Sequence, residues 1–371
     1  MDADEQLENY APGDFFFSTA RRTILGSGSV RALTNTDAVS LSDDASAALA
    51  EHPESLAVGV LPFDTAATPG HVVLPRTVRI AGCPRPERRK PVTAPMSVRA
   101  VPEPVRHAEA VARAVKILRA RGMRKVVLAR ALDLDFDADV DAQAILNNLV
   151  LDRAGGYTFA AALPNGRSLL GATPELLLSR TGGYVVSHPH AGSAPRSGDP
   201  VTDRDNGAGL ARSRKDHIEH AVLAEAVVET LRPFCRRLEV PREPSLVSTP
   251  TMWHLGTKIT GELVDRDITA LRLAAALHPT PAICGSPTEA ARELVGELEP
   301  FDRGYYAGTV GWMDARGDGE WAVSIRCAEV GARSLRLYAG GGIVPASDPK
   351  AELDETSAKF QTFLHAMGLE L

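Results

Sequence analysis

Residues 321–359 read WAVSIRCAEVGARSLRLYAGGGIVPASDPKAELDETSAK, and this stretch decides the fold. Residues 321–330 and 334–338 are rich in β-forming side chains, and the Gly-Ala-Arg segment between them predicts the turn of a β-hairpin. The hairpin ends in Gly340-Gly341-Gly342. Glycines at the end of a strand let the backbone approach another group closely, because no Cβ stands in the way.

A helix is predicted directly after these glycines. Residues 347–349 are Ser-Asp-Pro, an N-cap oxygen followed by a proline suited to the first turn. Glu352, Glu355 and Lys359 then lie at i, i+3 and i+7, so they share one helix face. Two carboxylates one turn apart repel each other unless a cation or a proton lies between them. A solvated face is the ordinary interpretation, but the glycines and Arg326 nearby favour a site where arginine and a metal hold an anion.

Composition excludes several classes of function. The chain has 371 residues, of which 44% are hydrophobic and 24% charged, as is typical of globular proteins. A net charge of −6 and an isoelectric point near 6.0 argue against general nucleic-acid binding. No apolar run approaches the ~20 residues that span a bilayer, the N-terminus does not resemble a secretory signal, and the four cysteines lack CxxC spacing. We therefore expect a cytoplasmic protein with neither a membrane nor a nucleic-acid partner.

Hydrophobic periodicity predicts helices interspersed with antiparallel strands. Helices are predicted over 45–51, 105–121, 142–151, 203–232, 270–276 and 288–297. Strands are predicted at 15–17, 23–25, 56–63, 125–136 and 257–263, and an antiparallel meander at 157–163, 168–172, 175–180 and 184–188. Residues 81–104, rich in proline and charge, are predicted to be an exposed connection. This order predicts one large α+β domain in which helices flank antiparallel sheets.

Several polar residues stand out, but none identifies a function alone. Lys125 opens an otherwise apolar strand, where a lysine usually reaches solvent. Glu175 follows a Thr-Pro turn, where a carboxylate usually just ends the turn. Glu219 falls in line with the apolar stripe of the helix predicted over 203–232 and therefore needs a partner. Four histidines suggest zinc, although nothing brings them into a tetrahedral set and hydrogen-bonded histidine is far more common: His188, His190, His217 and His220.

Taken together, the segments from residue 105 to the C-terminus resemble the chorismate-binding enzyme family, which includes isochorismate, salicylate, anthranilate and aminodeoxychorismate synthases. The matching motifs are KVVLAR (125–130), GATPELLLSR (171–180), PHAGSAPR (189–196), RKDHIEH (214–220), WHLGTKITGEL (253–263), HPTPAICGSP (278–287), YYAGTVGW (305–312), WAVSIRCAEV (321–330) and AGGGIVPASDPKAELDETSAK (339–359). Residues 1–104 resemble the family's variable N-terminal part, and 105–371 its catalytic region. The resemblance implies one domain of antiparallel sheets flanked by helices, with the active site deep between two lobes.

The resemblance also implies a role for each residue that matches a family motif. Lys125 falls where the family has its water-activating base, and Glu175 where it has its general acid. Glu219 and Glu355 match the carboxylates that hold Mg²⁺, with Glu352 beside them as a further ligand. The remaining positions match substrate contacts: Arg326, Tyr306 and the backbone of Gly340 at the pyruvyl carboxylate, and Ser193, His254, Ala282, Ile325 and Lys359 elsewhere in the pocket.

These residue types suit the chemistry that the resemblance implies. Chorismate is a small dianion with a leaving hydroxyl at C4, and water attacking C2 must lose a proton while the departing hydroxyl gains one. A neutral Lys125 and a protonated Glu175 on opposite ring faces would supply both transfers, and burial favours both states. Mg²⁺ on Glu219 and Glu355 would neutralise the ring carboxylate and orient the ring.

Two alanines favour one subgroup of the family. Ala191 stands where one type of aminodeoxychorismate synthase has the nucleophilic lysine of a PIKGT motif, so that covalent route is closed. Ala282 stands where anthranilate and salicylate synthases typically have threonine and siderophore-type isochorismate synthases have alanine. We therefore expect a monomeric isochorismate synthase that acts on chorismate with Mg²⁺. A salicylate synthase and a silent chorismate-binding subunit are the alternatives, and the pathway that uses the product (siderophore, menaquinone or salicylate) stays open.

Overall fold

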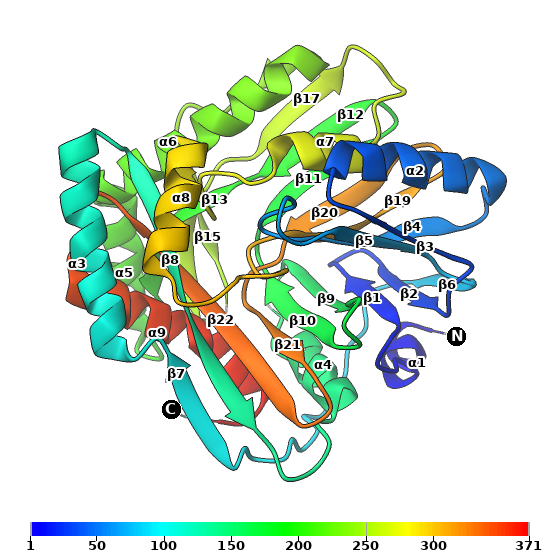
Figure 1. Ribbon diagram of the computed structural model, residues 1–371, viewed down its shortest axis with the longest axis horizontal. Helices are drawn as coiled ribbons and strands as arrows, with labels where there is room; N and C mark the ends of the chain where they lie inside the picture. The colour runs from blue at the N-terminus through cyan, green and yellow to red at the C-terminus, as the bar shows by residue number, and fades with distance from the viewer. Residues whose placement is uncertain (1, 154, 250, 370–371) are drawn as a thin grey trace.

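The computed structural model describes residues 2–153, 155–249 and 251–369. Within these residues, three antiparallel sheets are flanked by helices, as Figure 1 shows. The α-helices are α1 (Ala3–Glu8), α2 (Ala38–Glu51), α3 (Pro104–Arg121), α4 (Ala142–Leu151), α5 (Pro200–Arg212), α6 (Arg214–Leu231), α7 (Ala270–Leu277), α8 (Thr288–Leu298) and α9 (Pro349–Ala366). The predicted α+β class, with antiparallel sheets flanked by helices, is confirmed.

Sheet 1 contains the hairpin predicted around residues 331–333. Its path is β18 (Gly285–Ser286), β8 (Lys125–Asp135), β22 (Ser334–Ile343), β21 (Cys327–Val330), β10 (Ser168–Thr173), β9 (Tyr157–Ala162), β1 (Phe15–Ser18), β2 (Thr23–Ser27) and β6 (Thr77–Ala81), and β7 (Ser97–Val101) also pairs with β8. The longest pairing joins β22 to β8 and places Gly340 opposite Ala129. The predicted glycines therefore lie inside β22, which ends one residue after them.

Sheet 2 packs beside sheet 1 and sheet 3 is much smaller. Sheet 2 runs β14 (Cys235–Glu239), β17 (Ile259–Leu263), β12 (Tyr184–His188), β11 (Leu176–Thr181), β20 (Gly319–Val323), β19 (Thr309–Asp314), β4 (Leu56–Leu61), β5 (Gly70–Leu74) and β3 (Arg31–Asn35). Sheet 3 runs β13 (His190–Pro195), β16 (Met252–Gly256) and β15 (Ser245–Ser248). Strands from the N-terminal part pair with later strands in both large sheets, since β1 pairs with β9 and β4 with β19.

The middle of sheet 1 is buried on both faces, as β1 illustrates. Phe15 and Phe17 of β1 belong to a hydrophobic core that sheet 1 shares with sheet 2. Phe16, between them, belongs to a second core shared with α1, α4 and α9. Successive strand side chains point to opposite faces, so a run of three phenylalanines serves both cores. Full burial of each such side chain stabilises the fold by about 1.5–3 kcal/mol.

The chain crosses between sheets at several short segments, and one prediction is wrong at such a crossing. Residues 174–175 lead from β10 in sheet 1 to β11 in sheet 2, residues 324–326 lead from β20 in sheet 2 to β21 in sheet 1, and Pro189 leads from sheet 2 to sheet 3. The predicted meander is antiparallel, but its first two strands lie in sheet 1 and its last two in sheet 2. The Thr-Pro turn carries the chain across the core instead of closing a hairpin. The segment 321–330 is likewise two strands in different sheets.

Two further predictions need correction. The helix predicted over 203–232 is two helices, α5 and α6, because Ser213 is extended and its Oγ caps α6 by accepting from the Asp216 N–H at 3.3 Å. The segment 81–104, predicted to be an exposed connection, contains β7, which pairs with β8. Much of β7 is solvent-exposed, so its composition resembles that of a loop.

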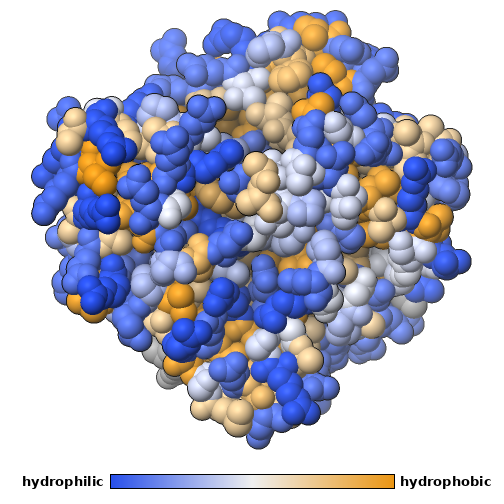
Figure 2. Space-filling model, viewed as in Figure 1, coloured by the Kyte–Doolittle hydropathy of each residue, from blue (hydrophilic) through white to orange (hydrophobic). Residues whose placement is uncertain are grey.

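Among the described residues, no helix is long and apolar enough to cross a bilayer. On the face shown in Figure 2, apolar residues are scattered among hydrophilic ones. Single exposed apolar side chains such as Ile80 and Met96 are common on protein surfaces.

Candidate active site

One pocket collects nearly all of the predicted site residues. It is lined by residues of sheets 1 and 3, by α6 and α9, and by residues 174–175, 282–283, 306–307 and 325–326 between elements. The predicted residues in its lining are Lys125, Glu175, Ser193, Glu219, His254, Ala282, Tyr306, Ile325, Arg326, Gly340, Glu355 and Lys359. Glu352 does not line the pocket and lies against Gly341 of β22.

Two segments that connect elements of the fold place strained backbone in the pocket. Arg326 and Ala307 are the only non-glycine residues with positive φ in the described ranges, at +51° and +58°, and both line the pocket. Such a conformation costs on the order of 1–3 kcal/mol and persists only where the surroundings enforce it. Two backbone hydrogen bonds enforce it here: Ala307 N–H donates to Ser324 O at 2.9 Å, and Ala172 N–H donates to Arg326 O at 3.1 Å.

Lys125 is held by a close approach of two strands. Its side chain is 1% exposed, and its Nζ lies 2.9 Å from Glu219 Oε1. Gly342 of the neighbouring strand faces both groups, since a Cβ there would lie 2.6 Å from Lys125 Cε and 2.2 Å from Glu219 Oε1. The prediction that the glycines permit a close approach is confirmed. The expectation that such a lysine reaches solvent is wrong, because β8 lies inside sheet 1 rather than at the surface.

Glu175 has the properties of a buried acid. Its side chain is buried at the crossing from β10 to β11, and its Oε1 accepts a long hydrogen bond of 3.5 Å from the His190 N–H. Burial raises the pKa of Glu175 to about 7, although this hydrogen bond and the charges of Lys125, Lys359 and Arg326 oppose the rise. A substantial fraction of the carboxyl is therefore protonated at neutral pH and can donate a proton.

Arg326, Tyr306 and His254 form a wall suited to a carboxylate. Burial lowers the pKa of Arg326 to about 10, so the guanidinium remains charged at neutral pH. Its Nη2 lies 3.5 Å from His254 Nε2, and burial followed by this charge lowers the pKa of His254 well below its usual range. Burial raises the pKa of Tyr306, so its hydroxyl stays a hydrogen-bond donor. A Cβ at Gly340 would lie 2.7 Å from that hydroxyl, so only glycine fits there.

The three predicted metal-binding glutamates each contact a different lysine. The ion pairs are Lys125–Glu219 at 2.9 Å, Lys359–Glu355 at 2.7 Å and Lys215–Glu352 at 3.0 Å. Burial raises the pKa of Glu352, and the charge of Glu355 adds to the rise. Burial acts in the same direction on Glu355, but Lys359 and a hydrogen bond from Ser193 outweigh it and lower its pKa. Neighbouring carboxyls with opposite pKa shifts are typical of functional sites.

The carboxylates fit a cation, although in the described ranges no three His, Cys, Asp or Glu side chains are arranged as a metal site. Glu352 Oε2 is buried without a hydrogen-bond partner. Burial works against the charge on Lys215, but all three glutamates outweigh it and raise its pKa. A lysine side chain thus lies within 3.0 Å of each of the three carboxylates.

The histidines do not form the suggested zinc set. The rings of His188 and His190 are in edge contact, with centroids 4.4 Å apart. His220 Nε2 is hydrogen-bonded to Thr257 Oγ1 at 2.7 Å, and His217 Nε2 to a backbone carbonyl at 2.9 Å. Within the described residues, these rings serve packing and hydrogen bonding, as the more common alternative predicts.

Lys215 is the site residue that the sequence reasoning missed. It lies in α6 within the RKDHIEH motif, four residues before Glu219. A lysine and a glutamate four residues apart share one helix face, and this spacing was the available signal. From the sequence alone, Lys215 is most simply interpreted as a solvated lysine. Its partner Glu352 lies on α9, far along the chain, so the sequence does not indicate their contact.

The pocket places a buried acid, Glu175, and a buried amine, Lys125, in one lining with the guanidinium of Arg326. A family model described as chorismate binding enzyme matches residues 78–368, and the chain belongs to this family. Isochorismate synthase DhbC of Bacillus subtilis (strain 168) is 45% identical, over 99% of this chain and 97% of that protein. Isochorismate synthase EntC of Escherichia coli (strain K12) is 38% identical, over 99% and 98%. The predicted family is confirmed.

Solved structures agree with this fold. A crystal structure assigned as a 2,3-dihydroxybenzoate-specific isochorismate synthase, DhbC from Bacillus anthracis, superposes with a TM-score of 0.93 at 41% identity and covers 99% of both chains. Anthranilate synthase component I from Streptococcus pneumoniae TIGR4 superposes with a TM-score of 0.78 at 20% identity, covering 93% of this chain and 92% of that one. The second similarity supports the fold alone.

Proposed function

We propose that this protein is an isochorismate synthase, the activity for which its relatives DhbC and EntC are named. The observation that carries the proposal is one pocket in which a buried acid, a buried amine and an anion-binding wall face the same space. Those are the groups that acid–base rearrangement of a small dianion needs. The substrate is chorismate and the product isochorismate.

In the proposed mechanism, Lys125 and Glu175 act as base and acid. Lys125 Nζ removes a proton from a water molecule while the oxygen of that water bonds to C2 of the ring. The ring double bond shifts, the C4–oxygen bond breaks, and Glu175 donates its proton so that the hydroxyl leaves as water. One water enters and one leaves, so substrate and product are isomers and the reaction is reversible.

The wall of Arg326 and Tyr306, with the Gly340 backbone, binds the pyruvyl carboxylate in this proposal. Arg326→Ala should raise KM about 10–100-fold and change kcat less, because a lost hydrogen bond to a charged group costs about 1.5–3 kcal/mol. Arg326→Lys keeps the charge and should lose less. Steady-state kinetics measure both variants, and an unchanged KM in Arg326→Ala would place the carboxylate elsewhere.

Mg²⁺ is the proposed cofactor, and Glu219 and Glu355, with Glu352, would hold it. When bound, it would neutralise the ring carboxylate and orient the ring. The unpartnered Glu352 oxygen and the absence of side chains at Gly341 and Gly342, which lie against two of these carboxylates, support this assignment. Magnesium prefers carboxylates combined with substrate oxygens and water, which matches this set.

Metal removal should abolish turnover. EDTA should stop the reaction and Mg²⁺ should restore it and raise Tm, because a ligand that binds only the native state stabilises it. Glu355→Gln should weaken apparent Mg²⁺ affinity at least about tenfold while the protein stays folded. Glu225→Gln changes an exposed glutamate on α6 and is the control. Full activity in EDTA would contradict the metal assignment.

Ala282 is the residue that favours isochorismate synthase over salicylate synthase. Its methyl group lines the pocket and offers no hydrogen bond near the ring. Ala282→Thr should change the rate or the product ratio about two- to tenfold, because an added hydroxyl can bond the ring carboxylate or a bound water. Ala346→Thr, at an exposed loop position outside the pocket, is the control. A silent Ala282→Thr would mean that this position does not influence product choice.

Product analysis tests the proposed function. The purified protein is incubated with chorismate and Mg²⁺, and isochorismate is followed by chromatography alongside salicylate fluorescence. We expect an equilibrium mixture of chorismate and isochorismate with little salicylate. Stoichiometric salicylate or pyruvate would favour the salicylate synthase alternative, and unchanged chorismate would favour a silent binding subunit.

A further inference from the structure

Glu299 and Arg303 form a buried ion pair next to the pocket but outside its lining. Their side chains are 3% and 1% exposed, and two hydrogen bonds join them: Nε to Oε2 at 2.8 Å and Nη2 to Oε1 at 2.5 Å. Both residues follow α8, and none of the roles described so far involves them. Replacing such a pair by apolar residues is often neutral or stabilising, so stability alone is a poor explanation for it.

The ion pair fills a gap at one edge of β8. On that edge β18 pairs with residues 125–126, Cys284 O accepts from the Val127 N–H at 2.8 Å, and β7 pairs with residues 131–135. Between them, Arg303 Nη2 donates to Val127 O at 2.8 Å and the Ala129 N–H donates to Glu299 Oε1 at 2.6 Å. The two side chains thus supply one acceptor and one donor where a neighbouring strand would otherwise supply them.

Arg303 also contacts two other segments that line the pocket, one through its side chain and one through its backbone carbonyl. Arg303 Nη1 donates to Ile283 O at 2.7 Å, directly after Ala282, and Arg303 O accepts from the Tyr306 N–H at 2.9 Å. Val127 itself lines the pocket two residues after Lys125. A planar guanidinium has its donors in fixed directions, so it sets the spacing between the groups it binds.

We propose that Glu299 and Arg303 are positioning residues that fix the distances between the strand of Lys125, the loop of Ala282 and the backbone of Tyr306. The inference rests on the proposed function, since it concerns the geometry in which chorismate meets its base and its carboxylate-binding wall. Neither residue touches the substrate, and both act through the backbone of those that do.

Arg303→Lys tests the proposal, because lysine keeps the charge beside Glu299 but cannot bind two carbonyls in fixed directions. We expect kcat/KM for chorismate to fall about 100-fold, as a displacement of about 1 Å does in other enzymes. The kcat should carry most of the fall because Lys125 moves, whereas the bond from the Tyr306 N–H to the backbone carbonyl of residue 303 is retained, so KM should change less. Glu299→Gln, which retains a hydrogen bond to Ala129, should cause a smaller fall of about tenfold.

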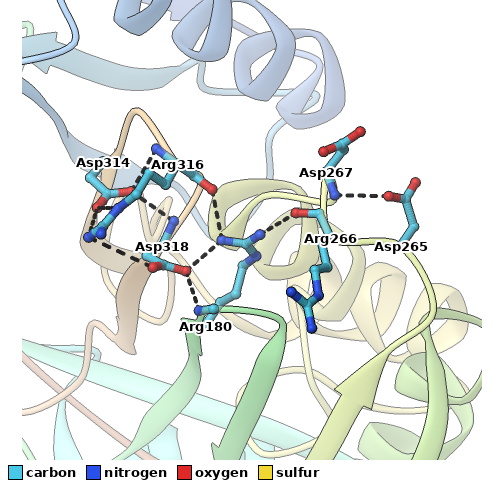
Figure 3. A network of polar contacts seen from close by, with 8 residues as sticks. Arg180, Asp265, Arg266, Asp267, Asp314, Arg316 and Asp318 are labelled. Carbon is cyan, nitrogen blue, oxygen red and sulfur yellow. Dashed lines mark hydrogen bonds and ion pairs between the residues drawn. The ribbon is translucent and has the colours of Figure 1, made fainter.

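A second buried arginine, Arg180 on β11 of sheet 2, provides a matched control for Arg303→Lys. Arg180 is also buried, pairs with Asp318 at 2.6 Å and donates to the carbonyls of Arg316 and Arg266, as Figure 3 shows. It binds one carboxylate and two carbonyls, as Arg303 does, but does not line the pocket. Arg180→Lys should lower Tm as Arg303→Lys does and leave kcat/KM within about twofold of wild type.

The outcomes separate this inference from the proposed function. Wild-type protein that makes no isochorismate would refute the function itself. If wild type is active and folded Arg303→Lys keeps its kcat/KM, the positioning role is wrong. It is equally wrong if Arg180→Lys loses as much activity, because the effect would then follow general stability. If Arg303→Lys does not fold, Glu299→Gln replaces it, and unchanged kcat/KM in that variant also overturns the proposal.

Discussion

Replacing Lys125 by glutamine should lower kcat about 10²–10⁴-fold and change KM little, because general base catalysis contributes a factor of that size. Glutamine can still donate a hydrogen bond to Glu219, whose Oε1 lies 2.9 Å from Lys125 Nζ, so the pocket keeps its shape. Steady-state kinetics with chorismate and Mg²⁺ measure the effect.

Lys350→Gln is the control for this variant, because Lys350 is exposed on α9 and forms an ion pair with Asp354 of the same helix. It should retain wild-type kinetics. Circular dichroism should show that both variants are folded. Near wild-type kcat in Lys125→Gln would mean that another group activates the water.

Glu175→Gln should lower kcat by a similar factor, about 10²–10⁴, because the amide cannot protonate the departing hydroxyl. The pH profile gives an independent signature. Burial raises the pKa of Glu175 to about 7, and a general acid works only when protonated, so wild-type kcat/KM should fall as the pH rises through about 7. The residual activity of Glu175→Gln should lack this basic limb.

Glu320→Gln is the matched control for the acid. Burial also raises the pKa of Glu320, which lies on β20 outside the catalytic pocket. That variant should keep both kcat and the basic limb. A basic limb that survives in Glu175→Gln would assign the titration to another group and remove the basis for Glu175 as the acid.

Local patterns predicted the elements better than their assembly. The helix over 105–121 and the strand over 125–136 agree with α3 and β8 to within one residue at each end, since periodicity and the Gly122 C-cap are local signals. The division of the meander between two sheets was not predictable, because a Thr-Pro turn closes a hairpin or crosses a core with the same local sequence. The break at Ser213 in the helix predicted over 203–232 was not predictable either. The Ser213 side chain caps α6 only when the backbone at Ser213 is extended, and the sequence does not specify that conformation.

The sequence predicted which residues belong to the candidate site but not how they are arranged in space. Motif resemblance named residues that the structure brings into one pocket, whereas spacing alone gave only Glu352, Glu355 and Lys359 on one face of α9. The positive φ of Arg326 and the contact between Lys215 and Glu352 depend on segments far apart in the chain. Such contacts follow from packing, which a single sequence does not display.

The origin of the new hydroxyl tests the central claim most directly. The protein is incubated with chorismate and Mg²⁺ in water enriched in the heavy oxygen isotope, and the isochorismate formed is examined by mass spectrometry. Water activated by Lys125 should leave the heavy isotope at C2 of isochorismate, and Lys125→Gln should form about 10²–10⁴-fold less labelled isochorismate in the same time. Isochorismate that carries no heavy isotope would contradict the account, because its hydroxyl would then have moved within the substrate.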